Sequence, residues 1–123
     1  MGLLQGKRIL LVEDEFLIAA MAEEMLTDLG AIPVGPAATL DQGLALAAEE
    51  MLDGAILDVN LGGARSEPIA AALKARGVPF VVATGYDARA SNHPHELTLS
   101  KPYTIEALEA RLSSALAGVA SAD

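Results

Sequence analysis

The sequence predicts an α/β fold built on a five-stranded, doubly wound parallel sheet of flavodoxin-like order 2-1-3-4-5, with helices on both faces. Three observations lead to this prediction. Short apolar runs alternate along the chain with longer segments of helical periodicity. The strongest runs are apolar at consecutive positions, as expected of strands covered on both faces. The length of 123 residues suits one domain, so we expect residues 1–123 to form a single unit.

The expected strands are apolar runs that are too short to be helices. Three of them are strong, and the runs at residues 31–34 and 97–100 are weaker candidates. Pro33 lies in one of the weaker runs and suits an edge strand, since proline cannot donate a hydrogen bond to a central ladder. In chain order, the expected strands are residues 8–12, 31–34, 55–57, 79–83 and 97–100.

The first two helices are expected where apolar side chains recur at helical spacing. The first spans about residues 15–29, with Phe16 in its apolar stripe and Gly30 placed to end it. The second begins after Thr39, a favourable N-cap residue, and has Met51 at the end of its apolar stripe. Each of these helices connects two strands, which implies right-handed crossovers between parallel strands.

The later helices are expected from their start signals and from their composition. A third helix follows Ser66, a cap residue, and Pro68, which suits a first helical turn. The last helix follows Thr104 and has a regular apolar stripe. Residues 85–96, between the fourth and fifth strands, include Gly, Asp, Ser, Asn and Pro, which disfavour a regular helix, so we expect the fourth helix to be short or irregular.

Composition excludes several classes of function. The chain has 8 Lys and Arg against 17 Asp and Glu, a net charge of −9, which disfavours nucleic acid and anionic membranes as partners. It has no Cys, so thiol catalysis and zinc–thiolate sites are excluded. No apolar run approaches the roughly 20 residues of a membrane span, and the N-terminus lacks the apolar core of a signal peptide. We therefore expect a cytoplasmic protein.

Polar residues stand where the apolar runs end, at the edge of the sheet where such folds bind ligands. Glu13 and Asp14 follow the first strand, Asp58 the third, Thr84 the fourth and Lys101 the fifth. Because the first and third strands are neighbours in the expected order, three carboxylates should meet there and repel one another unless a cation joins them. An oxygen-only set of this kind suits Mg²⁺. A carboxylate beside Mg²⁺ can also attack phosphorus to form an aspartyl phosphate.

Each of these residues has an ordinary interpretation when it is taken alone. An Asp after a strand is usually a turn or cap residue, and an acidic run can simply favour a helix N-terminus. Thr84 could be a strand-end hydroxyl and Lys101 a solvated charge. Their joint occurrence, each at a strand end and in the right order, favours a site that accepts a phosphoryl group on Asp58.

Over nearly its whole length, the sequence resembles the receiver domain of bacterial two-component response regulators. The matching segments are residues 9–15, 56–61, 83–85 and 100–103. The resemblance implies that Asp58 is the phosphoacceptor, with Thr84 as the switch hydroxyl and Lys101 as the ion-pair partner of the phosphoryl group. The corresponding Lys-Pro peptide bond is often cis in this family, so the resemblance implies a cis bond between Lys101 and Pro102.

The same resemblance implies a magnesium site. Asp14 would bind Mg²⁺ directly and Glu13 through water, Asp58 would complete the acidic set, and Asn60 would offer its backbone carbonyl. The phosphoryl group would come from a histidine kinase or a histidine phosphotransfer protein, and the output protein is not specified. The resemblance leaves formation of a homodimer open. It implies no enzyme activity beyond phosphorylation and dephosphorylation of Asp58 itself.

Two features depart from the common receiver pattern. The usual switch aromatic lies three residues before the lysine, where this chain has Thr98. Residues 79–86 instead resemble the Pro-Phe-x-Phe-Ala-Thr-Gly-Tyr motif of a receiver subgroup that lacks this aromatic, and only Val82 differs from it. In this subgroup we expect Thr84 to act on Gly85 and Tyr86, so that the segment after the fourth strand becomes ordered on signalling.

Two other functions are compatible with parts of this pattern. A Mg²⁺-dependent phosphohydrolase of the haloacid dehalogenase type also uses a strand-end Asp, a Thr and a Lys. Such enzymes generally have a second Asp as general acid two residues after the nucleophile, where this chain has Asn60. A receiver-like interaction module that is never phosphorylated is the other alternative, and the complete set of site residues argues against it.

Overall fold

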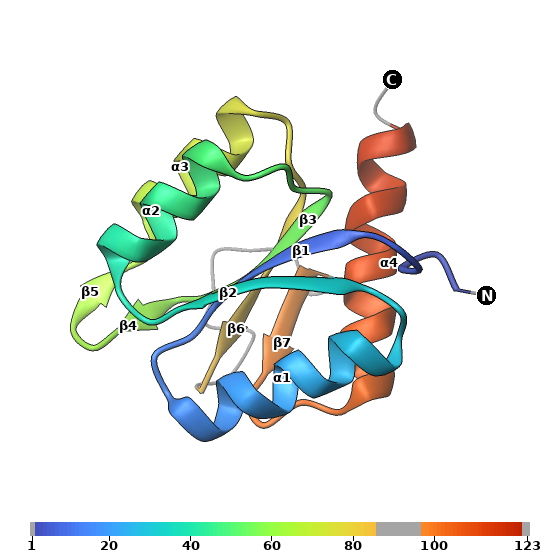
Figure 1. The fold of residues 1–123 in the computed structure, drawn as a ribbon, viewed down its shortest axis with the longest axis horizontal. Helices are drawn as coiled ribbons and strands as arrows, with labels where there is room; N and C mark the ends of the chain where they lie inside the picture. The colour runs from blue at the N-terminus through green and yellow to red at the C-terminus, as the bar shows by residue number, and fades with distance from the viewer. Residues whose placement is uncertain (1, 86–96, 122–123) are drawn as a thin grey trace.

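The computed structural model describes residues 2–85 and 97–121, and it confirms the predicted five-stranded parallel sheet. The strand order is β2-β1-β3-β6-β7, and each neighbouring pair is parallel (Figure 1). The edge strand β2 contains Pro33, as the sequence indicated. The strands are β1 (Arg8–Val12), β2 (Ile32–Ala37), β3 (Gly54–Asp58), β6 (Phe80–Thr84) and β7 (Thr98–Ser100).

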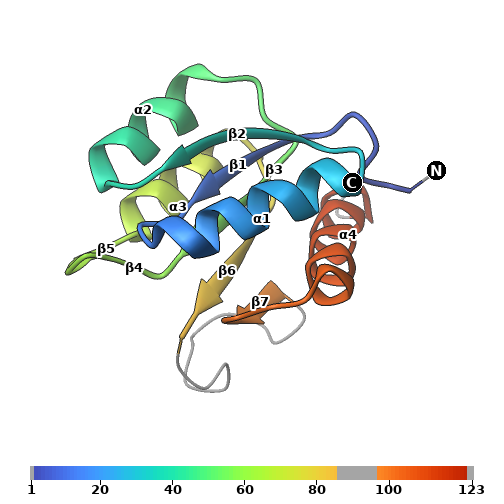
Figure 2. The ribbon, with the colours of Figure 1, turned by 60° about the horizontal axis from the view of Figure 1, so that its bottom comes forward.

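Helices cover both faces of this sheet. Helices α1 and α4 lie on one face, and helices α2 and α3 lie on the other (Figures 1 and 2). The described helices are α1 (Phe16–Asp28), α2 (Leu40–Glu49), α3 (Glu67–Ala75) and α4 (Ile105–Ser121). None of the helices in the described part of the chain is long and apolar enough to cross a membrane. The short or irregular helix expected within residues 85–96 falls almost wholly outside the described residues.

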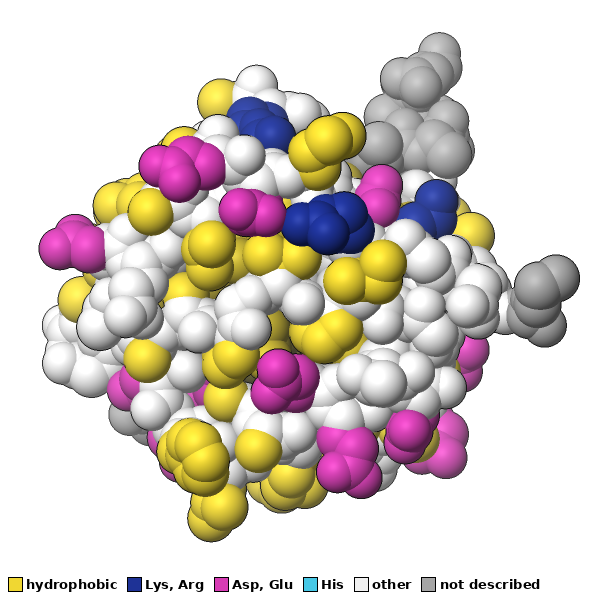
Figure 3. All heavy atoms as spheres, viewed as in Figure 1, with side chains coloured by type: hydrophobic (Ala, Val, Ile, Leu, Met, Phe, Trp, Pro, Cys, Tyr) yellow, Lys and Arg dark blue, Asp and Glu magenta, His cyan; other side chains and the backbone are white. Residues whose placement is uncertain are grey.

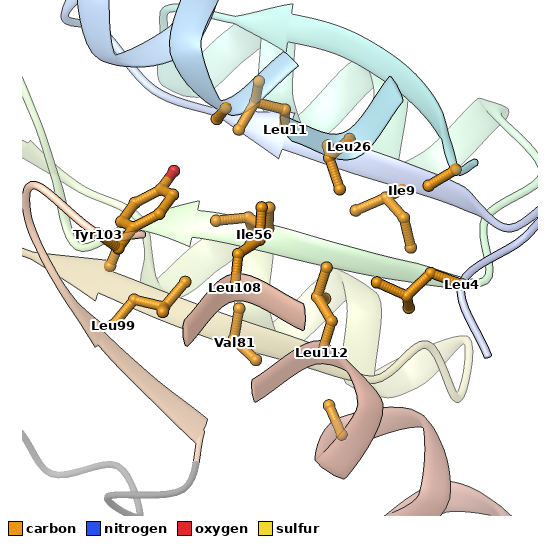
Figure 4. Close-up of a cluster of buried hydrophobic side chains, with 14 residues drawn as sticks. Leu4, Ile9, Leu11, Leu26, Ile56, Val81, Leu99, Tyr103, Leu108 and Leu112 are labelled. Atoms are coloured by element: carbon orange, nitrogen blue, oxygen red, sulfur yellow. The ribbon is translucent and has the colours of Figure 1, made fainter. Parts of the chain in front are cut away.

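Alternate side chains of the central strands divide the core into two layers. Ile9 and Leu11 of β1 face α1 and α4, whereas Leu10 and Val12 face α2 and α3. All four are essentially inaccessible to solvent. The consecutive apolar residues in the sequence therefore reflect a strand that is buried on both sides. Figure 4 shows the layer under α1 and α4, which extends to Tyr103 at the end of the sheet that carries the polar residues.

The predicted helix starts are mostly confirmed. The Oγ1 atom of Thr39 accepts a hydrogen bond from the backbone amide of Gln42, and Thr104 caps α4 in the same way through the amide of Ala107. Ser66 occupies the N-cap position of α3, but its side chain makes no capping bond. Its hydroxyl instead donates to the carbonyl oxygen of Val59 at 3.4 Å, so the expected capping role is wrong in this detail.

Two apolar residues that were expected in buried stripes are exposed. Phe16 is the first residue of α1 and is 82% exposed, because the buried side of the helix starts at Ala19. Met51 is 76% exposed, because α2 ends at Glu49 and helical spacing no longer applies. Hydrophobic side chains protrude at the lower edge of the face shown in Figure 3, where α1 begins. Acidic side chains are spread over the same face, and its basic ones form no large patch.

A small hairpin next to β3 was not predicted. Strands β4 (Asn60–Leu61) and β5 (Ala64–Arg65) pair in antiparallel fashion around a two-residue turn. The turn consists of Gly62 and Gly63, which have φ angles of 58° and 97° and therefore favour glycine. This hairpin directly follows Asp58, so it forms one wall of the edge where the strand-end residues meet.

Candidate functional site

A buried lysine is surrounded by carboxylates at the C-terminal edge of the sheet. The Lys101 Nζ atom lies 3.2 Å from each Glu13 carboxylate oxygen and 3.2 Å from Asp58 Oδ2. Glu15 Oε1 is a fourth acceptor at 3.3 Å. The Glu13 and Lys101 side chains are 2% and 8% exposed, whereas that of Glu15 is 61% exposed. The structure thus brings Glu13, Asp58 and Lys101 together as the sequence predicted, and Lys101 is not a solvated charge.

Backbone hydrogen bonds hold this site on the sheet. They continue the parallel ladders just beyond the strand ends, which leaves little freedom to the segments that carry the site residues. The amide of Glu13 donates to the carbonyl of Ala37 at 2.9 Å, and the amide of Lys101 donates to the carbonyl of Thr84 at 2.8 Å. The amide of Val59, next to Asp58, donates to the carbonyl of Ala83 at 3.0 Å.

Carboxylate oxygens of Glu13, Asp14 and Asp58 lie within 4.8 Å of one another. Two of these side chains are buried and Asp14 is exposed, so the cluster is open to solvent on one side. Hard oxygen ligands with room for water are what Mg²⁺ requires, because it usually keeps several of its waters. The donor set therefore fits a magnesium ion. In the structure, the ammonium group of Lys101 provides positive charge to two of the three carboxylates.

The charges of the site strongly perturb two of its groups. Burial is the main cause that raises the pKa of Asp58 from 3.8 to about 7, and the adjacent Glu13 raises it further through a hydrogen bond and through its charge. Lys101 and the amide of Asn60 act in the opposite direction. For Lys101, burial lowers the pKa, but the charges of Asp58 and Glu13 outweigh burial and raise it. A carboxyl group with a raised pKa in an acidic cluster suits a site that gains a cation.

The predicted switch residues lie beside this cluster. Thr84 ends β6 and is 7% exposed, and the adjacent Gly85 is exposed. The peptide bond between Lys101 and Pro102 is cis, as the resemblance implied. Tyr86 lies outside the described residues.

Thr98, which stands in place of the usual aromatic, is 2% exposed on β7. Its backbone carbonyl accepts a hydrogen bond from Arg111 Nε of α4 at 3.1 Å. No aromatic side chain is present at this position, so ring rotation here cannot report the state of the site.

Asn60 makes two local hydrogen bonds after β3. Its amide donates to Asp58 Oδ1 at 3.3 Å, and its side-chain oxygen accepts from the amide of Gly63 at 3.0 Å. The side chain therefore holds the turn of the hairpin in place. A carboxamide cannot act as a general acid, which removes the proton donor that a haloacid dehalogenase-type hydrolase needs at this position.

Sequence reasoning missed two contributors to this edge. Glu15 belongs to the acidic run after the first strand and was given no role of its own, but it is the fourth acceptor around Lys101. Its place directly after Glu13 and Asp14 was the available signal. Tyr103 lies in the matching segment 100–103 and was given no separate role, because the environment of its hydroxyl group can be seen only in three dimensions.

No protein-family model matches the chain, and no curated protein sequence matches it. Solved structures do match. SdrG from Sphingomonas melonis Fr1 is 42% identical, with a TM-score of 0.73, and the match covers 94% of this chain and 97% of SdrG. The chain belongs to the family of SdrG.

Two further neighbours are named as a response regulator and as the receiver domain of one. The PhyR response regulator REC domain of Erythrobacter litoralis is 26% identical, with a TM-score of 0.79, over 94% of this chain and 93% of that domain. PhyR from Brucella abortus is 27% identical, with a TM-score of 0.83, over 95% of this chain. This chain spans about half of the Brucella protein, since the match covers 50% of it. These neighbours support a role in response-regulator signalling.

Proposed function

We propose that residues 1–123 form a single receiver domain that works as a phosphorylation-controlled switch, with Asp58 as the phosphoacceptor. The observation that carries this proposal is the buried contact of 3.2 Å between Lys101 Nζ and Asp58 Oδ2, within an acidic cluster that fits Mg²⁺. The similarity to SdrG and to receiver domains adds support. In this proposal, a carboxylate oxygen of Asp58 attacks phosphorus, and the bond from phosphorus to a histidine nitrogen breaks. The electron pair stays on that nitrogen, and because the other ring nitrogen carries a proton, neutral imidazole leaves.

Each site residue has a distinct part in this reaction. Glu13, Asp14, Asp58 and the backbone carbonyl of Asn60 would hold Mg²⁺, which supplies positive charge to the phosphoryl oxygens when it is bound. Lys101, whose Nζ atom lies 3.2 Å from Asp58 Oδ2, would add a second positive charge. The Thr84 hydroxyl donates a hydrogen bond to the same oxygens. Water can reach this site past the exposed Asp14, so slow loss of the phosphoryl group by hydrolysis is the only other reaction we assign to the domain.

We assign the chain to the receiver subgroup with the Pro-Phe-x-Phe-Ala-Thr-Gly-Tyr type of motif. In this assignment, Thr84 moves toward the phosphoryl group and draws on Gly85 and Tyr86, while Pro102 keeps Lys101 aimed at Asp58. The buried Thr98 supports this assignment, because the usual aromatic position is occupied by a small side chain. The signal would then pass through the segment that follows β6.

The proposed donor is a histidine kinase or a histidine phosphotransfer protein. The proposed output is a change in protein–protein contacts, with a separate output protein or a second copy of this chain as the partner. Nucleic acid is not proposed as a partner, because acidic residues outnumber basic ones by 17 to 8.

The test is the intact mass of the protein after incubation with Mg²⁺ and a small phosphodonor such as acetyl phosphate. We expect the parent to gain one phosphoryl group and the Asp58→Asn variant to gain none. Asn keeps the size of the side chain but is not a nucleophile. Equal gain by both proteins would place the modification elsewhere. No gain by the parent, even with a phosphorylated histidine donor, would contradict the proposal.

A further inference from the structure

The hydroxyl group of Tyr103 is buried without a partner. Among the residues that the structure describes, it is the only buried side-chain nitrogen or oxygen atom with no hydrogen bond. Its ring packs in the apolar layer under α1 and α4, and the residue is 8% exposed (Figure 4). Phenylalanine would fill the same space without the free-energy cost of burying an unbonded hydroxyl. Packing alone therefore does not account for a tyrosine at this position.

This hydroxyl group is directed toward the functional site. Figure 4 shows it turned toward the end of β1 that leads to Glu13. Burial is the main cause that raises the pKa of Tyr103, and the charge of Glu13 is the next cause, ahead of the opposing charge of Lys101. The carboxylate of Glu13 is thus the charged group that acts most strongly on the phenol.

Glu13 depends on Lys101 for its principal counter-charge. Its carboxylate is 2% exposed, and it accepts from Lys101 Nζ through both oxygens and from the amide of Glu15. Lys101 is shared, because its three protons face four carboxylate oxygens at 3.2–3.3 Å. An anionic group on Asp58 would compete for this ammonium group. Glu13, whose own side chain is 2% exposed, would then lose hydrogen bonds from Lys101.

We propose that the Tyr103 hydroxyl is a reserve donor for Glu13, which forms its hydrogen bond when Lys101 turns from Glu13 to a phosphoryl group on Asp58. Tyr103 is a positioning residue in this scheme, since it acts through Glu13 and touches no reacting atom. It stands between the Lys101-Pro102 peptide and the capped start of α4 at Thr104. A shift of the ring toward Glu13 would therefore be felt at the first turn of α4. This inference rests on the proposed function.

The test compares the parent with the Tyr103→Phe variant, using Mg²⁺ with beryllofluoride as the phosphoryl analogue. The variant should melt at a higher temperature than the parent in the absence of these ligands, because a buried unbonded hydroxyl has been removed. It should bind beryllofluoride roughly tenfold more weakly, as expected for the loss of one hydrogen bond to a charged group. A residue that only packs would not change the two properties in opposite directions. Thr27→Val, which removes a hydroxyl group near the end of α1, is the control and should leave the affinity within about twofold of the parent.

A spectroscopic measurement adds a second readout. The chain has two tyrosines, so protein labelled with ¹³C at tyrosine Cζ gives two signals, and Tyr103→Phe identifies the one from Tyr103. We expect this signal to shift when beryllofluoride and Mg²⁺ bind to the parent. An unmoved signal, an unchanged affinity, or a lower melting temperature of the variant would each overturn the inference and leave the proposed function intact. Failure of the parent to bind the analogue would overturn both.

Discussion

The Glu13 carboxylate accepts hydrogen bonds from the Lys101 ammonium group through both of its oxygens, each at 3.2 Å. Both side chains are almost fully buried, and they come from positions 88 residues apart in the chain. This pair is the centre of the electrostatic network that also includes Asp58. The stability of the free protein and its affinity for cations should therefore be linked through the same few atoms.

The first prediction concerns pH and Asp58. Its pKa is raised from 3.8 to about 7, so between these values the folded protein holds a proton that the unfolded chain has lost. The contribution of the Asp58 carboxyl group to the free energy of unfolding is therefore fully present below pH 4. It is lost as the pH rises through 7, and the free energy of unfolding falls by at most about 1.4 kcal/mol per pH unit. Asp58→Asn removes this titration. The free energy of unfolding of the variant, relative to that of the parent, should therefore increase as the pH rises.

Urea denaturation of both proteins without Mg²⁺, from pH 4.5 to pH 8, measures this difference. Titrating groups that do not interact with Asp58 are common to both proteins and cancel. A difference in the free energy of unfolding that stays constant over this range would show that Asp58 titrates normally in the folded protein.

The second prediction concerns the loss of the buried cation. Lys101→Met keeps a long side chain but leaves Glu13 and Asp58 without their ammonium partner. We expect the variant to be less stable than the parent by about 3 kcal/mol, the usual cost of removing one partner of a buried ion pair. Mg²⁺ should bind several-fold more tightly, because it no longer competes with a resident positive charge.

Denaturation in the absence of Mg²⁺ and calorimetric titration with Mg²⁺ test these two effects. Lys74→Met is the control, since Lys74 is exposed on α3 and should change stability by less than about 0.5 kcal/mol. Weaker binding of Mg²⁺ to Lys101→Met would show that the ammonium group helps to shape the cation site.

The third prediction concerns cation binding through Asp14. A ligand that binds only the folded state raises stability by about 2.7 kcal/mol at a hundredfold excess over its dissociation constant. Mg²⁺ should therefore raise the melting temperature of the parent, and a chelator should reverse the effect. Asp14→Asn should melt like the parent without Mg²⁺, since Asp14 is exposed, but should lose most of the gain.

Glu24→Gln removes an exposed carboxylate from α1 away from the cluster and is the control. It should retain the full effect of Mg²⁺. Stabilisation of Asp14→Asn equal to that of the parent would place the bound cation elsewhere.

The degree to which sequence predicted this structure depends on the kind of feature. The strand order and the meeting of Glu13, Asp58 and Lys101 were predictable, because parallel strands end at one edge of a sheet and polar residues mark those ends. The hairpin after Asp58 was not, because two-residue strands have no periodicity. The burial of Phe16 was wrongly predicted, because periodicity identifies the buried face of a helix but not the residue at which the rest of the protein begins to cover that face. The unbonded Tyr103 hydroxyl depends on distances that no local pattern encodes.

The last prediction concerns the packing of α2 on α3. A Cβ atom on Gly43 would lie 2.5 Å from Ile69 Cδ1, so α2 approaches α3 at a point where only glycine fits without movement. Gly43→Val should separate these helices and lower the free energy of unfolding by about 2 kcal/mol, within the range for overpacked cores. Ala45→Val, at an exposed position of the same helix, adds a similar branched side chain and should cost less than about 0.7 kcal/mol. Urea denaturation of the three proteins measures both values. Valine forms helix better than glycine, so an unchanged or raised stability of Gly43→Val would mean that the Ile69 side chain makes room and that the contact does not control the effect.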